Sequence, residues 1–307
     1  MPRALPSALL LSSGRPARGA APLAAAAALV VALTSASRAQ DESAVKRGAY
    51  LFAAADCVSC HTDVKNKGAR LAGGRALKTP FGTFYSPNIT PDPKTGIGTW
   101  SEADFHRALR EGKRRDGAYL YPVFPYTSFT GMTNQDIADL YAYLRTQKPA
   151  VQPDKEHDVR FPFGFRPLLW GWRTLYFTEG PLAPVPGRSA EWNRGRYLAE
   201  AVAHCEECHT PRNFLGALER DRAFAGNPDG PDGQKAPDIT PDIATGIGKW
   251  KLDDIIEVLA TGTKPDGDFV GAGMAEVVDG TAKLSDADRR AIAVYIRALP
   301  PHRATGK

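Results

Sequence analysis

Cysteine and methionine are scarce in this sequence, which has four of the first and three of the second among 307 residues. All four cysteines belong to two short motifs, so no thiol remains for a disulfide or a catalytic cysteine. A glycine-rich nucleotide loop after a strand and a serine activated by histidine and aspartate are also lacking. We therefore do not expect the chain to oxidise an organic substrate by itself.

A long apolar run occurs only near the N-terminus, where Arg3, Arg15 and Arg18 precede the stretch 20–33. Ser37-Arg38-Ala39 then supplies the small residues that a signal peptidase requires. We predict that residues 1–39 are a secretory signal peptide and that the mature protein is periplasmic. The alternative, a retained membrane anchor, is weakened because the run is shorter than the roughly 20 residues that span a bilayer.

An excess of positive charge is also lacking once this segment is removed. The full chain has 39 Lys and Arg against 34 Asp and Glu, but four of its arginines lie in the first 39 residues, which leaves 35 basic side chains. A basic surface that neutralises phosphates is therefore not expected, and nucleic acid is not a predicted partner.

The four cysteines form two motifs, Cys57-Val58-Ser59-Cys60-His61 and Cys205-Glu206-Glu207-Cys208-His209. In C-x-x-C-H, two thiols add to the vinyl groups of a porphyrin and the histidine ligates the iron, which is the chemistry of c-type haem. Zinc needs four convergent ligands, and a redox dithiol needs no histidine after its second cysteine. We therefore predict two covalently bound haem c groups, with His61 and His209 as iron ligands.

The motifs lie in two copies of one sequence unit. Residues 47–51 match 194–198, and the loop 86–100 matches 236–250, at offsets of 147 to 150 residues. Such a constant offset is typical of duplication of a whole domain. The predicted organisation after the signal peptide is a first haem domain at 40–148, a connecting segment at 149–190 and a second haem domain at 191–307.

Short helices are the predicted elements of each copy. One precedes each haem motif, one follows each repeated tryptophan, and one closes each copy; the expected ranges are about 42–55, 101–112, 136–145, 191–203, 252–262 and 285–299. Thr133 and Ser285 are the expected caps of the closing helices. Since nothing shows a sustained strand pattern, the sequence predicts an all-α architecture in which the haem forms much of each core.

The connecting segment 149–190 contains seven prolines together with many aromatic residues. The prolines predict irregular structure, whereas the aromatic residues argue against a flexible linker. Packing between the haem domains is the favoured interpretation, and a docking surface for a partner protein or membrane interface is the alternative. Arg166 and Arg173 argue against a transmembrane helix.

Methionine is a common second axial ligand of c-type haem. Besides Met1, the chain has only Met132, 71 residues after His61, and Met274, 65 residues after His209. An isolated methionine is most often core filler. One methionine before the closing helix of each copy nevertheless predicts that Met132 and Met274 complete the two iron sites.

Taken together, these features resemble dihaem class I cytochromes c that serve as electron-transfer subunits of bacterial periplasmic dehydrogenases for alcohols, aldehydes or N-heterocycles. The resemblance rests on the haem motifs, the doubled loop at 86–100 and 236–250, and the segments 121–126 and 273–278. It implies that the backbone carbonyls of Pro87 and Pro237 hold the ligating histidines. Ordinary loop prolines are the alternative.

The resemblance implies an electron carrier and not an enzyme. Its electrons would come from a periplasmic dehydrogenase and pass to a cytochrome, a quinone or a terminal oxidase, and peripheral membrane association stays open. A dihaem peroxidase is the main alternative, and a redox sensor is a weaker one. A peroxidase needs a haem whose sixth position opens, whereas each copy here offers a histidine and a methionine.

Nearby charge predicts an order for the two haem potentials, because positive charge favours reduced iron. Lys65, Lys67 and Arg70 follow the first motif, whereas Glu206 and Glu207 lie inside the second. The sequence therefore predicts the higher potential at the first haem.

Overall fold

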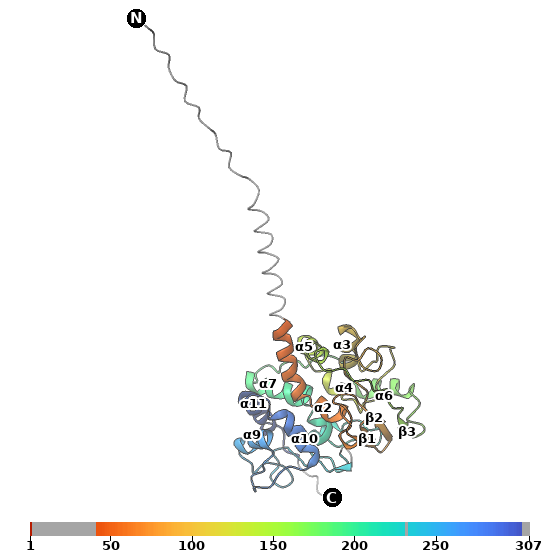
Figure 1. The fold of residues 1–307 in the computed structure, drawn as a ribbon. Helices are drawn as coiled ribbons and strands as arrows, with labels where there is room; N and C mark the ends of the chain where they lie inside the picture. The colour runs from red at the N-terminus through yellow and green to blue at the C-terminus, as the bar shows by residue number, and fades with distance from the viewer. Residues whose placement is uncertain (2–40, 231–232, 303–307) are drawn as a thin grey trace. The chain divides into compact units, whose positions relative to one another are not determined.

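The computed structural model describes residue 1, residues 41–230 and residues 233–302. Apart from residue 1, the predicted signal peptide lies outside these described residues. Residues 41–54 are helical, and the helices that follow in the first half are α2 (Cys57–His61), the 3-10 turn η1 (Val64–Asn66), α3 (Glu102–Glu111), α4 (Tyr126–Phe129) and α5 (Asn134–Arg145) (Figure 1). The second half contains α7 (Ala190–Arg196), the π-helical η2 (Tyr197–Val202), α8 (Glu206–His209), the 3-10 turn η3 (Arg220–Arg222), α9 (Leu252–Thr261), α10 (Ala272–Thr281) and α11 (Asp286–Arg297).

Local capping explains where the main helices begin. The Ser101 hydroxyl accepts the Asp104 N–H at 3.1 Å, and the Asp104 carboxylate accepts the Ser101 N–H at 3.0 Å, which is a capping box at the start of α3. Thr133 and Ser285 cap α5 and α11 through their hydroxyls, as predicted. At the other end of α3, Gly112 adopts a left-handed conformation with φ 58°.

In each half, the first helix crosses the closing helix at a glycine. A Cβ atom on Gly48 would lie 1.9 Å from the carbonyl oxygen of Asp139, and one on Gly195 would lie 1.9 Å from that of Ala291. No larger residue fits at such a distance. The second of these crossings is the packing of α7 on α11, which lie side by side in Figure 1.

Two repeat-related tyrosines join the halves by equivalent contacts. The Tyr50 hydroxyl donates to the Asp288 carboxylate at 2.6 Å, and the Tyr197 hydroxyl donates to the Asp136 carboxylate. Each hydroxyl also accepts the backbone N–H of the residue that caps the partner helix, at 3.0 and 3.1 Å. Because each half supplies a tyrosine to the other, the chain from Ala44 onward packs as one unit.

The helices are accompanied by a small antiparallel sheet, which corrects the all-α prediction. The hairpin of β1 (Ala76–Thr79) and β2 (Gly82–Tyr85) pairs on its second strand with β3 (Asp158–Val159). The strands have four, four and two residues, which is too short for a clear alternating pattern. The third strand also comes from the connecting segment, so its pairing depends on tertiary contacts.

The connecting segment also contains regular structure, contrary to the prediction. Its helix α6 (Leu168–Tyr176) touches both halves. The Arg173 guanidinium lies 5.2 Å from the centre of the Tyr126 ring, and the Trp172 indole N–H donates to the Leu215 carbonyl at 2.9 Å. Trp170 on the same helix is 65% exposed. The segment thus packs between the halves and leaves part of its aromatic surface open. None of the described helices is long and apolar enough to cross a membrane.

Candidate haem sites

Each C-x-x-C-H motif forms a single helical turn. In α2 the turn brings Cys57 and Cys60 to the same face, and His61 follows directly. The helix α8 arranges the second motif in the same way. A residue with left-handed backbone precedes each motif closely, Asp56 with φ 47° and His204 with φ 41°. The repeat is therefore visible in the backbone as well as in the sequence.

Both motifs line one cavity of about 1680 Å³. Repeated apolar residues form much of its wall, including the pair Ile89 and Ile239 and the pair Ile97 and Ile247. A mostly apolar cavity with a few polar groups is typical of a cofactor site. Its apolar walls and its contact with both motifs fit a porphyrin attached at each.

The two histidines are held by the predicted proline carbonyls. The distance from His61 Nδ1 to the Pro87 carbonyl oxygen is 2.8 Å, and that from His209 Nδ1 to the Pro237 carbonyl oxygen is also 2.8 Å. A ring nitrogen that donates to a carbonyl leaves the other nitrogen, Nε2, free as a ligand. Burial lowers the pKa of both imidazoles, so both are neutral at neutral pH, the form that binds a metal.

Polar side chains hold the loops that present these prolines. The Asn88 side-chain oxygen accepts the Thr90 N–H at 2.9 Å, and the Asp238 carboxylate accepts the Thr240 N–H at 2.8 Å. Both asparagine and aspartate can close such a turn through a side-chain oxygen. The residue after each proline therefore fixes the carbonyl that orients the ligating histidine.

The four thiols are free and buried enough to stay protonated in the polypeptide. Burial raises the pKa of Cys57 to about 12 and that of Cys60 to about 11, and it raises the pKa of Cys205 and Cys208 to about 12. Among the described residues, no group of three or more Cys, His, Asp or Glu side chains is arranged to hold a metal ion by itself.

The two candidate methionine ligands lie in different places. Met274 belongs to α10, lines the cavity and is partly buried. Met132 has no exposed surface, is part of the main hydrophobic core and is not among the residues that line the cavity. The expectation that they occupy corresponding positions is corrected, because Met132 directly precedes the cap of α5 whereas Met274 lies 11 residues before the cap of α11.

Sequence reasoning missed a pair of cations that line the cavity. Arg114 follows the glycine that ends α3 by two residues, and Lys264 follows the glycine that ends α9 by two residues. Cationic side chains at the rim of a haem cavity suit the carboxylates of the porphyrin propionates. The signal was available in the sequence, as a basic residue at the same repeat position.

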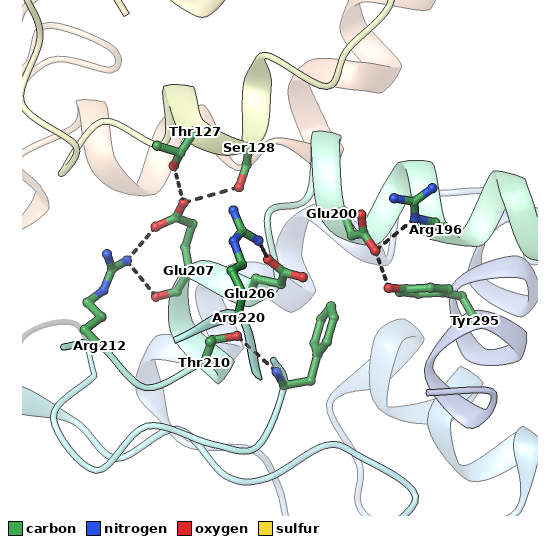
Figure 2. A network of polar contacts seen from close by, with 11 residues as sticks. Thr127, Ser128, Arg196, Glu200, Glu206, Glu207, Thr210, Arg212, Arg220 and Tyr295 are labelled. Atoms are coloured by element: carbon green, nitrogen blue, oxygen red, sulfur yellow. Dashed lines mark hydrogen bonds and ion pairs between the residues drawn. The ribbon is translucent and has the colours of Figure 1, made fainter. Parts of the chain in front are cut away.

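The two glutamates inside the second motif belong to a polar network (Figure 2). Glu207 pairs with Arg212 at 2.5 Å and accepts the Thr127 hydroxyl of α4 at 2.8 Å. Burial alone would raise the pKa of Glu207, but Arg212 and the hydrogen bonds lower it below its usual value. Glu206 pairs with Arg220, yet burial outweighs this partner and raises the pKa of Glu206 to about 7.

Comparison with known proteins identifies the family. Residues 45–148 match the family description for cytochrome c. The diheme cytochrome c-type protein of Cereibacter sphaeroides is 46% identical over 263 residues, which cover 83% of this chain and 85% of that protein. A nicotinate dehydrogenase subunit of Pseudomonas putida is 44% identical over 256 residues, or 83% of this chain and 21% of that protein. The fructose dehydrogenase cytochrome subunit of Gluconobacter japonicus is 41% identical over 266 residues, or 86% of this chain and 54% of that subunit.

This chain therefore matches most of one relative but only about a fifth and about half of the other two. The names of the relatives agree with the resemblance noted in the sequence, since they are dehydrogenase subunits or diheme cytochromes. The cavity, the histidine pairs and the thiols fit the haem that this family carries. The chain belongs to the cytochrome c family and is an electron-transfer protein with covalently bound haem c.

Proposed function

We propose that the protein carries two haem c groups and passes electrons from a periplasmic dehydrogenase to a cytochrome, a quinone or a terminal oxidase. The observation that carries this proposal is the pair of C-x-x-C-H turns, each with its histidine held at 2.8 Å by a proline carbonyl. The units are the tandem haem domains 40–148 and 191–307, with residues 149–190 between them.

The residues of each site have distinct roles. Cys57 and Cys60 attach one porphyrin, Cys205 and Cys208 attach the other, and the two histidines ligate iron through Nε2. Haem c supplies a one-electron iron couple when bound. The proline carbonyls fix each imidazole plane, so little in the protein has to move when the charge of the site changes. Met274 is the further ligand that lines the cavity at the second site.

The two motifs are close enough to serve one electron path. His204, which directly precedes the second motif, lies with Nε2 3.3 Å from the carbonyl oxygen of Ala55, two residues before the first motif. The thiols of Cys60 and Cys208 are near enough that each charge would affect the other. Because both motifs also line one cavity, electrons can pass between the two sites inside this chain.

The donor and the compartment are inferred from the relatives and from the N-terminus. Several relatives are named as cytochrome subunits of alcohol, fructose or gluconate dehydrogenases, which supports a dehydrogenase as the donor. The predicted signal peptide at 1–39 supports a periplasmic location, where c-type haem is attached.

The test uses the exported full-length protein. Its intact mass should exceed that of the processed chain by two haem masses, and the colour should stay with the polypeptide in acid acetone. A dehydrogenase that copurifies with it should reduce both haems in the presence of substrate, whereas the cytochrome alone should oxidise no substrate. Bound zinc, a single haem, or substrate turnover without a partner would contradict the proposal.

A further inference from the structure

The two halves can be aligned by their own hydrogen bonds around the glycines that end α3 and α9. The Leu120 N–H donates to the Gly112 carbonyl at 2.8 Å, and the Val270 N–H donates to the Gly262 carbonyl at 2.9 Å. Each return strand also forms a bridge just after the glycine, at residues 113 and 119 in the first half and at 263 and 269 in the second. Leu120 and Val270 are therefore equivalent residues.

This alignment places a phenylalanine where the second half has its methionine. Four residues beyond Leu120 is Phe124, and four residues beyond Val270 is Met274. Both side chains are partly buried, pack against the main hydrophobic core and line the cavity. Phe124 also lies 63 residues after His61, close to the 65 residues that separate Met274 from His209.

Met132 is equivalent instead to a core leucine. It directly precedes Thr133, the cap of α5, just as Leu284 directly precedes Ser285, the cap of α11. Met132 and Leu284 are 0% and 3% exposed, and both belong to the hydrophobic core. The role of Met132 is therefore the packing of its closing helix.

The segment that carries Phe124 is held in place by the second haem motif. The hydroxyls of Thr127 and Ser128 in α4 donate to Glu207 at 2.8 and 3.2 Å. The Phe124 ring also packs on that of Phe129 with centres 5.5 Å apart. These contacts leave little freedom for Met132 to replace Phe124 at the cavity wall.

His157 is the other cavity-lining side chain that is able to ligate iron at the first site. Its Nδ1 accepts the Tyr85 N–H at 3.2 Å, and its ring packs on that of Phe84 at 5.3 Å. Tyr85 lies two residues before Pro87, whose carbonyl holds His61. His157 thus lies beside the loop that supports His61, whereas a second axial ligand has to approach the opposite face of the porphyrin.

We propose that the two haem sites differ in ligation: Met274 completes the site of His209, whereas the site of His61 has Phe124 in the corresponding place and a sixth position without a methionine. The proposal rests on the proposed function, since it requires a haem at each motif. The apolar ring of Phe124 favours a small neutral molecule over an anion, so carbon monoxide is a suitable probe. Because methionine ligation raises a haem potential, the first haem has the lower potential, the reverse of the order expected from nearby charge.

The test counts ligation per haem in the intact holoprotein. The ferric protein should show the iron–thioether charge-transfer band for one of its two haems, and the ferrous protein should bind one carbon monoxide per two haems. Met274→Leu should abolish the band and double the carbon monoxide bound. Met132→Leu, a matched change of similar volume, should leave both unchanged. Phe124→Met should double the band, suppress carbon monoxide binding and raise the lower potential.

Several results would overturn the inference. A band for both haems that falls by half in Met132→Leu would restore Met132 as a ligand. A bis-imidazole spectrum at one haem that disappears in His157→Ala would assign the position to histidine. If Phe124→Met does not fold, the unmodified protein with the Met132→Leu and Met274→Leu variants still decides. An intact mass with fewer than two haems would instead contradict the proposed function.

Discussion

The two haem sites are built from the same parts up to the histidine and differ beyond it. His61 and His209 have the same carbonyl partner at the same distance, and the loops behind them are closed by equivalent side chains. Across the cavity, one site has Phe124 and the other has Met274. Duplication therefore preserved the support of the fifth ligand, whereas the segment that carries the sixth diverged in length and in residue.

The divergence has a structural cause that can be followed between the glycine turn and the closing helix. Nine residues separate Phe124 from the cap Thr133, whereas 11 separate Met274 from the cap Ser285. The short α4 is tied to Glu207 of the second motif, and the longer α10 carries Met274. The first half thus uses this segment to join the two halves, and the second half uses it to supply a ligand.

The strongest test of the shared scaffold is the glycine at each helix crossing. Gly48→Ala and Gly195→Ala each place a methyl group 1.9 Å from a carbonyl oxygen, so the helices have to separate. We expect each variant to lose about 3 kcal/mol of unfolding free energy, measured by denaturation of the holoprotein. Gly171→Ala on α6 is the control, because its Cβ would meet nothing within 4 Å. A wild-type stability for either crossing variant would contradict the packing described.

The exchanged tyrosines test whether the join between the halves is symmetric. Tyr50→Phe and Tyr197→Phe each remove a hydroxyl that donates to a carboxylate of the other half. We expect losses of about 1–2 kcal/mol that are similar for both, because each leaves a partly buried carboxylate with one donor fewer. Tyr143→Phe, whose ring packs on Phe52 within the first half, should cost less. A large effect at only one of the two tyrosines would show that the join is asymmetric.

The smallest expected difference between the sites is a pH dependence of their potentials. Burial raises the pKa of Asp56 beside the first motif to about 6, and it raises the pKa of Glu206 inside the second motif to about 7. Each carboxyl becomes negative only as the pH rises through its pKa, and negative charge favours ferric iron. The potential of the first haem should therefore fall across about pH 6 and that of the second across about pH 7.

Each change should be on the order of tens of millivolts. Potentiometry at several pH values should show that Asp56→Asn flattens the lower transition and that Glu206→Gln flattens the upper one. If the two transitions persisted in the double variant, other groups would have to account for them.

The same carboxylates show why counting charges in the sequence is a poor guide to the order of potentials. By sequence alone, Glu206 and Glu207 count as two negative charges inside the second motif. In the structure, Glu207 pairs with Arg212 and Glu206 pairs with Arg220. Their charges are therefore largely compensated, and ligation becomes the stronger influence on the potential.

What the sequence determined by itself was local. The haem motifs, the caps at Ser101, Thr133 and Ser285, and the prolines behind the histidines are visible because each depends on residues a few positions apart or on direct comparison of the repeats. The pairing of β3 with β2 and the helix α6 were missed because short elements in a proline-rich segment depend on distant contacts.

The choice of the sixth ligand was decided only by the tertiary structure. Counting residues from each histidine made Met132 and Met274 look equivalent, because loops of different length nearly compensated for the difference. Whether a side chain faces a cavity depends on the hydrogen-bond register of its segment and on what packs behind it. At Met132 that register directs the side chain into the core, and at Phe124 and Met274 it directs the side chains to the cavity wall.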